Sequence, residues 1–139
     1  MIWSEAVENE IKYKLFDYRD HRGRNDIKEW TLGHEKRQRG QLNAKLDQLQ
    51  RHGEDLGSKI LLRMSATVLK LKARTNSVEL RPMICAGPIE DDAEFTILIG
   101  AKEVQWVLQP VDAVQRAEAR REEVIEDSTQ RRVPHERVS

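Results

Sequence analysis

Four short apolar segments between residues 67 and 109 constrain the fold of this chain most strongly. They read VLKLKA, VELRPMI, FTILIG and VQWVLQ, and they are rich in residues that favour strands. In the first segment leucines and lysines alternate, as they do in a strand with one buried face: Leu69, Lys70, Leu71 and Lys72. The four segments therefore predict three or four strands in an antiparallel meander.

The last two segments are expected to form a hairpin of Phe95–Ile99 with Val104–Gln109. The connection between them, GAKE, contains a glycine and has the usual length of an antiparallel link. Trp106 falls on the predicted inward face, so we expect it to be a core residue. Pro110 is placed to end the last strand.

A strand and a pair of helices are predicted before this sheet. Residues 11–18 read IKYKLFDY and alternate as a strand does, while Trp3 is expected to cover an edge or contact a partner. Asp26, followed by Glu29, offers a capping box that opens a helix. A stripe at helical spacing continues to a helix-ending Gly53: Leu42, Leu46 and Leu49. We interpret 26–52 as two helices or one broken helix, and 54–66 as a loop with a helical turn.

A C-terminal helix is predicted after the sheet, capped by Asp112 and Gln115. Residues 128–139, STQRRVPHERVS, are expected to be a disordered basic tail. Residues 1–127 then form a single domain, because a chain of 139 residues buries one core. The predicted class is α+β, with an antiparallel sheet of about four strands, the N-terminal helix pair on one face and a C-terminal helix.

Charge is distributed unevenly although the formal net charge is zero. Residues 1–82 hold 17 Lys and Arg against 12 Asp and Glu, whereas residues 83–139 hold 7 against 12. A basic N-terminal portion suits a phosphate backbone or an acidic partner, although dispersed solvated charge explains the counts equally well. The single cysteine, Cys85, allows no disulfide within the chain, and no apolar run reaches membrane-spanning length. We expect a soluble cytoplasmic protein without a membrane partner.

The order of elements and the stretch LKLKARTNSVELRP resemble the RelE/HigB (RelE/ParE) superfamily of bacterial and phage toxins, in its phage-derived HigB-like branch. There, a Lys-Leu pair precedes a short loop and a strand reading roughly Gly-Leu-Tyr-Glu-Leu-Arg. The matching residues here are Lys70-Leu71, the loop ARTNS, Val78-Glu79-Leu80-Arg81 and, in the last helix, Ala117, Arg120 and Arg121. The likeness in order of elements covers residues 11–126.

Two motifs of the family are absent. Phe95-Thr96-Ile97-Leu98 stands where the family usually has Tyr-Arg followed by apolar residues. A Lys-Lys segment that many relatives carry after the last strand is also missing, because VQWVLQ leads directly to Pro110. Both departures remove groups that the family is thought to use for cleavage or RNA contact.

The resemblance implies a metal-independent endoribonuclease without cofactor, which cuts mRNA in the ribosomal A site through attack of a 2′-hydroxyl on the next phosphate. Such a reaction needs a base, an acid and a cation. Arg81 is the expected cation, because guanidinium binds phosphate through two parallel hydrogen bonds. Glu79 is either the base or, more readily, a brace that pairs with Arg81.

Further basic residues are candidates for RNA contact. Lys70, Lys72 and Arg74 would form a cationic row along one strand face, although lysines also protect edge strands against aggregation. Arg22 and Arg24 would form a basic loop, for which a plain exposed turn is the alternative reading.

Two hypotheses of different class follow. The first is the toxin component of a toxin–antitoxin pair, a growth-inhibiting ribosome-dependent endoribonuclease or a weakened relative, with an antitoxin, the ribosome and mRNA as partners. The second is a non-catalytic binding module on the same fold, such as a phage inhibitor of a host target or a ParE-like gyrase inhibitor. A third possibility is an unrelated small α+β protein.

Overall fold

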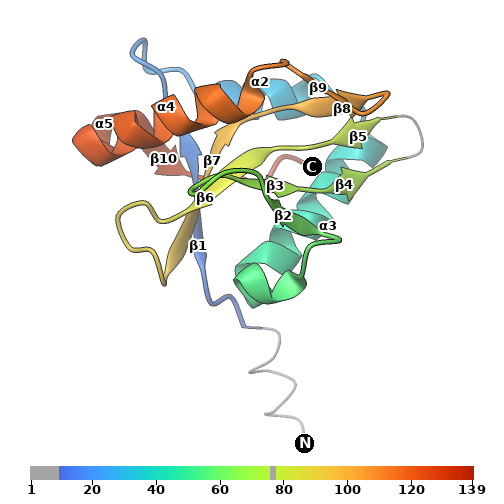
Figure 1. Cartoon of the computed structure of the whole chain (residues 1–139), viewed down its shortest axis with the longest axis horizontal. Helices are drawn as coiled ribbons and strands as arrows, with labels where there is room; N and C mark the ends of the chain where they lie inside the picture. Colours follow the sequence, from blue (N-terminus) through green and yellow to red (C-terminus); the bar gives the residue numbers. More distant parts are fainter. Residues whose placement is uncertain (1–9, 76–77) are drawn as a thin grey trace, which may run out of the picture.

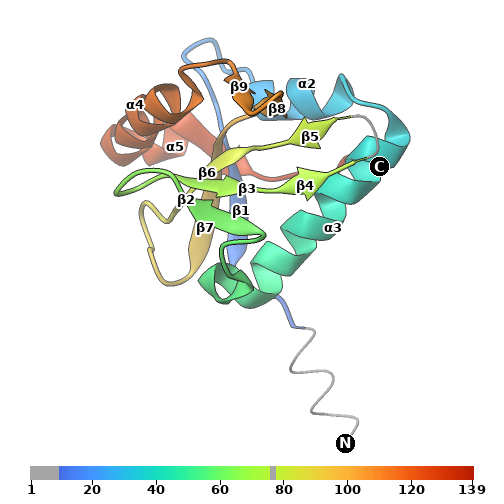
Figure 2. The same ribbon diagram turned by 45° about the vertical axis from the view of Figure 1, so that its right-hand side comes forward.

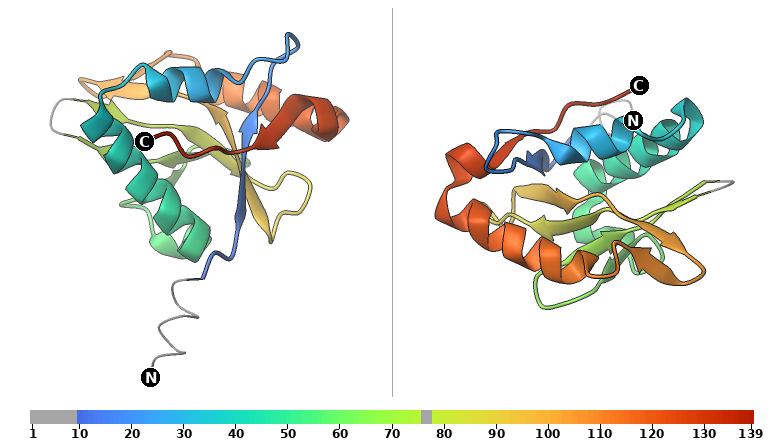
Figure 3. Two further views of the ribbon diagram at one scale, coloured as in Figure 1. Left: turned by 180° about the vertical axis from the view of Figure 1, so that it is seen from behind. Right: turned by 90° about the horizontal axis from the view of Figure 1, so that it is seen from above.

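The computed structural model describes residues 10–75 and 78–139, and these form three layers (Figure 1). The helices are α2 (Asp26–Leu32), α3 (Lys36–His52), α4 (Ala113–Glu126) and α5 (Ser128–Arg131), with a 3-10 turn η1 (Gly53–Leu56). Seen from above, the helix pair α2 and α3 lies on one side of the strands and α4 on the other (Figure 3). In this described part of the chain no helix is long and apolar enough to cross a membrane. Trp3 and the last two residues of the loop ARTNS lie outside it.

The strands form two sheets. A six-stranded sheet has the spatial order β10 (Arg132–Pro134), β1 (Lys14–Tyr18), β7 (Glu94–Ile99), β6 (Met83–Ala86), β3 (Leu69–Leu71) and β2 (Leu61–Arg63). A four-stranded sheet has the order β4 (Ala73–Arg74), β5 (Glu79–Leu80), β8 (Lys102–Val104) and β9 (Val107–Gln109). All neighbours are antiparallel except β1 and β7, which are parallel. The α+β class with antiparallel pairing is confirmed, but the strands exceed the four predicted, and β2 forms within the stretch predicted as a loop.

The helix pair buries the predicted leucine stripe against one sheet face. Leu42, Leu46 and Leu49 are at most 2% exposed, and they join the core cluster that contains Leu80 of β5. Gly53 caps the end of α3 with a φ of +56°, which is costly for any residue with a side chain. The predicted N-cap of the first helix is wrong by one residue, because the side chain of Asn25 accepts the N-terminal hydrogen bond.

The opposite sheet face is covered by α4. Ala113, Ala117 and Val124 of this helix are buried, and the two alanines pack in a cluster with Cys85 of β6. Ile125 of the same helix is 43% exposed and lies outside this buried side. Small residues on the inner side of α4 allow the helix to lie close to the sheet.

The predicted hairpin of Phe95–Ile99 with Val104–Gln109 is wrong. β7 pairs with β1 and β6, and the chain continues through Gly100 into β8. Gly100 is needed for a close approach, because a Cβ atom there would lie 2.2 Å from Cδ2 of Trp30. The true hairpin joins β8 to β9, with Val104 opposite Val107 and a two-residue turn between them.

The C-terminal residues also differ from the predicted disordered tail. Residues 128–139 form α5 and then β10, which pairs antiparallel with β1 at the edge of the six-stranded sheet. The segment beyond β10 continues toward α3, as the view from behind shows (Figure 3). There Asn43 of α3 donates a hydrogen bond to the carbonyl oxygen of Val138.

The only cysteine of the sequence provides a test of this packing. The Cys85 side chain is fully buried, and burial raises the pKa of its thiol to about 12. Because the thiolate is the reactive form, we expect the folded protein not to react with an aromatic disulfide reagent at pH 8. Absorbance should report one thiol per chain only after urea is added. Rapid reaction without urea would contradict the burial of β6 beneath α4.

Candidate functional site

A cleft of about 700 Å³ opens between α3 and the β8–β9 hairpin, over the four-stranded sheet. Figure 2 shows α3 running beside the β4 edge of this sheet. The lining residues come from α3, the segment before β2, the strands and the hairpin turn: Gln41, Lys45, Lys59, Ile60, Lys72, Arg74, Glu79, Arg81, Glu103, Gln105 and Trp106. Five of them are cationic and two are acidic, so the cleft carries a positive excess on a chain of zero net charge.

Glu79 and Arg81 share the cleft as the strand alternation predicts. Leu80 between them is fully buried in the core, whereas both charged neighbours line the cleft. Burial of Leu80 therefore fixes the direction in which Glu79 and Arg81 point.

Both Nη atoms of the Arg81 guanidinium donate hydrogen bonds, and Nε faces a carboxylate. Nη1 donates to the carbonyl oxygen of Leu80, and Nη2 pairs with the carboxylate of Glu79. Nε lies 3.4 Å from Oε1 of Glu103, which is an ion pair without the alignment of a hydrogen bond. The side chain is only 10% exposed. A phosphate could form two parallel hydrogen bonds with Arg81 only by displacing one of these carboxylates.

The carboxylate of Glu79 pairs with two arginines in this arrangement. Burial alone would raise the pKa of Glu79, but hydrogen bonds from Arg74 and Arg81 outweigh it, so the pKa lies below its ordinary value. Arg74 Nε donates to Oε1 at 2.9 Å. A carboxylate with a lowered pKa accepts a proton poorly near neutral pH.

Lys70 does not extend the cationic row that the sequence predicts. Its side chain is 11% exposed, and Nζ donates to Oε1 of Glu103 at 3.1 Å. Lys70 is not among the residues that line the cleft. It therefore pairs with a carboxylate of the cleft lining from beneath, whereas Lys72 and Arg74 continue the row at the surface.

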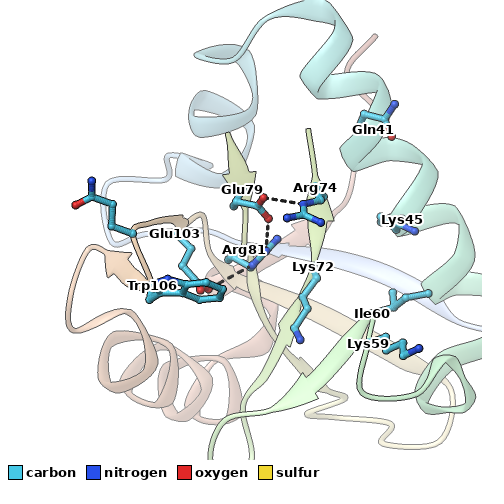
Figure 4. Close-up of a pocket in the computed structure, with 11 residues that line it drawn as sticks. Gln41, Lys45, Lys59, Ile60, Lys72, Arg74, Glu79, Arg81, Glu103 and Trp106 are labelled. Carbon is cyan, nitrogen blue, oxygen red and sulfur yellow. Dashed lines mark hydrogen bonds and ion pairs between the residues drawn. The ribbon is translucent and has the colours of Figure 1, made fainter. Parts of the chain in front are cut away.

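Three lysines face the cleft without being neutralised. Across residues 10–75 and 78–139, no hydrogen bond or ion pair engages the side chains of Lys45, Lys59 or Lys72. Arg74 keeps both Nη groups available, because its pairing with Glu79 uses Nε and its side chain is 85% exposed. Figure 4 shows Lys45 and Lys59 at one side of the cleft, Lys72 and Arg74 at its centre, and Trp106 at the other side.

Sequence reasoning missed Lys45, Lys59 and Trp106 as cleft residues. Lys45 lies one residue before the buried Leu46, so the helical period places it at the border of the leucine stripe, which was an available signal. Lys59 gave no signal, because its segment lacks periodicity. Trp106 was expected in the core, yet it is 93% exposed in the turn between β8 and β9.

The basic loop of Arg22 and Arg24 lies elsewhere. Both residues are exposed in the connection between β1 and α2, and neither lines the cleft. Arg24 Nη2 pairs with Glu29 at 2.7 Å. The exposed-turn alternative therefore describes this loop better than a shared RNA site does.

The cleft has the chemistry of anion binding rather than proton transfer. Its described lining contains no histidine, tyrosine or cysteine, and its two carboxylates are already paired with cations. Phe95-Thr96-Ile97-Leu98, which replaces the Tyr-Arg motif of the resembled family, is buried in β7 away from the cleft. Within the described ranges no group of three or more His, Cys, Asp or Glu side chains could hold a metal ion.

Comparison with known proteins adds no relative. No protein-family model, curated protein or solved structure matches the chain.

Proposed function

We propose that this chain is a toxin-fold protein of the RelE/HigB type that binds single-stranded RNA in the cleft, as a weakened relative of ribosome-dependent mRNA endoribonucleases. Its partners are then an antitoxin and, through mRNA, the ribosome. The order of one strand, two helices, further strands and a C-terminal helix supports this fold assignment. The Glu79-Leu80-Arg81 strand adds support, because both charged residues face the cleft.

The cluster of unneutralised cations carries the proposal. Lys45, Lys59 and the pair Lys72 and Arg74 come from three separate segments of the chain, and the fold brings them together at one opening. Single-stranded nucleic acid is bound by such grooves, because each phosphate contact releases counterions from the strand.

Binding is supported better than cleavage. A cleavage site needs a base, an acid and a free cation close to the scissile phosphate. Here the candidate base Glu79 has a lowered pKa, and the candidate cation Arg81 already holds two carboxylates. We therefore expect cleavage to be weak or absent even where RNA binds.

A binding module for a host protein is the second candidate. Four exposed apolar residues on and after the β8–β9 hairpin favour it, because such groups gather at protein interfaces: Val104, Trp106, Val107 and Val111. A neighbouring gene for a small helix-turn-helix protein would favour the toxin assignment over this one.

Removing two cleft lysines is expected to weaken RNA binding. In the double variant Lys45→Gln/Lys72→Gln, affinity for a short single-stranded RNA should fall on the order of ten-fold, as for two exposed ion pairs of about 0.5–1 kcal/mol each. The slope of log affinity against log salt concentration should shrink by about 0.7 for each lysine that contacts a phosphate. Fluorescence anisotropy of labelled RNA at several salt concentrations measures both quantities.

The matched control is Lys14→Gln/Lys36→Gln, because both lysines are exposed and lie outside the cleft. This control should bind RNA like the wild type. Equal losses in the two double variants would show dispersed charge rather than a site. Induced expression in bacteria, with mapping of mRNA ends, then separates the hypotheses: new ends indicate cleavage, whereas growth arrest without new ends indicates inhibition by binding.

A further inference from the structure

Trp106 is the most exposed large apolar residue in the described chain. It is 93% exposed, and its indole adjoins the lysines and arginines of the cleft as part of the lining. A tryptophan in water loses the burial that stabilises this residue elsewhere in proteins. Neither the core nor a neighbouring element accounts for its presence at this position.

The backbone at this turn is also unfavourable for the residues that occupy it. Gln105 has a φ of +51° and Trp106 a φ of +70°, and among the described residues they alone combine positive φ with a side chain other than glycine's. Two-residue hairpin turns of this kind favour Asn-Gly, because those residues tolerate the left-handed conformation. A bulky residue there is strained, and strain of this type is typical of functional positions.

The strands on either side of the turn fix the position of the Trp106 backbone. β8 and β9 pair on both sides of it, and β8 also pairs with β5, which carries Glu79. The cleft floor and the hairpin are thus one hydrogen-bonded sheet. The exposed indole of Trp106 lies at one side of the cleft, with the cations of Lys72 and Arg74 between it and α3 (Figure 4).

We propose that Trp106 stacks on a base of the single strand whose phosphates bind the cleft lysines. This inference rests on the proposed function and names the part of the RNA that the site recognises. Every base has an aromatic face, so an exposed indole beside a cationic groove binds a strand with little sequence preference. A protein surface that packed on the indole of Trp106 would leave the unneutralised lysines beside it without anionic partners.

Three variants test the stack. Trp106→Ala should weaken binding of single-stranded RNA by about 5- to 150-fold, the range for loss of one base–aromatic stack. Trp106→Tyr should retain most of the affinity, because a phenol ring also stacks. Replacing Gln105-Trp106 by Asn-Gly should raise the thermal unfolding temperature, because it relieves the turn, and yet weaken RNA binding as strongly as alanine does.

The matched ligand is an abasic sugar-phosphate oligomer of the same length. It should bind the wild type and Trp106→Ala equally, because it lacks the group that stacks. If RNA binds Trp106→Ala as tightly as it binds the wild type, stacking is refuted while RNA binding in the cleft stands. If neither oligomer binds the wild type, the proposed function itself fails, and the hairpin is better explained as a protein contact.

Discussion

Arg81→Ala is expected to lower the free energy of unfolding by about 3 kcal/mol, the lower end of the cost of breaking a buried ion pair. Arg81 holds Glu79 and Glu103, whose side chains are 31% and 14% exposed. Both carboxylates keep a second cation, since Arg74 pairs with Glu79 and Lys70 with Glu103. The decrease in the free energy of unfolding is therefore smaller than it would be for a buried carboxylate left without any cation. Urea unfolding followed by tryptophan fluorescence measures it.

Arg74→Ala is the matched control for this prediction. Arg74 also pairs with Glu79, but its side chain is 85% exposed, so the loss should be below about 1 kcal/mol. Arg74→Ala should still weaken RNA binding, because Arg74 presents charge to the cleft. If Arg81→Ala is as stable as the wild type, Arg81 does not brace the two glutamates. Arg81 would then count among the cations that can bind phosphate.

The bracing role has a pH signature. The pKa of Glu79 lies below its ordinary value, because hydrogen bonds from Arg74 and Arg81 outweigh the effect of burial. The unfolded chain then binds more protons than the folded one, so Glu79 stabilises the fold above the unfolded pKa and loses this effect as pH falls through the folded pKa. In Arg81→Ala this part of the acid-induced loss should be smaller.

If the wild type arrests growth, loss of that arrest in Arg81→Ala would consequently not identify a catalytic residue. A destabilised protein is degraded more readily in cells, so growth arrest can disappear for reasons unrelated to RNA. Lys45 and Lys72 are better positions for a functional test, because each is partly exposed and neither holds a buried carboxylate.

Patterns with a period were predictable from the sequence. The leucines of α3 repeat at helical spacing and are buried as expected, and Leu80 alternates with its charged neighbours as a strand requires. Each pattern depends only on neighbouring residues along the chain, because a helix or strand with one buried face shows it whichever element covers that face. The parallel pairing of β1 with β7 was not predictable, because residues 14 and 94 are brought together only by the whole fold.

One glycine and one tryptophan were assigned to the wrong environment from the sequence. Gly100 was interpreted as part of a turn, yet it admits the indole of Trp30, and the real turn contains no glycine. Trp106 was interpreted as core, yet it is exposed beside the cleft. Sequence propensities reflect what stabilises a fold. Trp106 lies at a strained, solvent-facing position, which these propensities do not predict. Such a departure points to function.

The residues of the cleft were also predicted only in part. Arg81, Glu79, Lys72 and Arg74 were found because they lie in or directly beside the short strands β4 and β5, within the stretch that carries the recognisable motif. Lys59 belongs to an irregular segment, and its distance from the motif along the chain gave no reason to join them. The sequence also did not show which charged side chains are paired. Lys70 and Lys72 look equivalent in sequence, yet only Lys70 is buried against Glu103.

Arg132→Ala is expected to cost about 3–5 kcal/mol, more than Arg81→Ala. Glu94 begins β7 with a side chain 3% exposed, and among the described residues Arg132 is the cation that pairs with it. Arg132 also stacks on Phe16, with its guanidinium carbon 3.8 Å from the ring centre. Alanine would leave a buried carboxylate without a cation, with the backbone N–H of Ile89 still donating to it at 3.2 Å, and would loosen β10 from β1. Thiol labelling of Cys85 during urea unfolding reports this loss directly.

Arg137→Ala is the matched control, because it changes the same residue type in the same C-terminal segment. Arg137 donates to both carboxylate oxygens of Asp47 at 2.9 and 2.8 Å, but it is 60% exposed, so its loss should stay below about 1 kcal/mol. The double variant Glu94→Gln/Arg132→Gln should recover part of the stability, because no unpaired charge is then buried. If Arg132→Ala and Arg137→Ala cost the same small amount, residues 128–139 do not hold the sheet edge, and the disordered tail expected from the sequence is the better description.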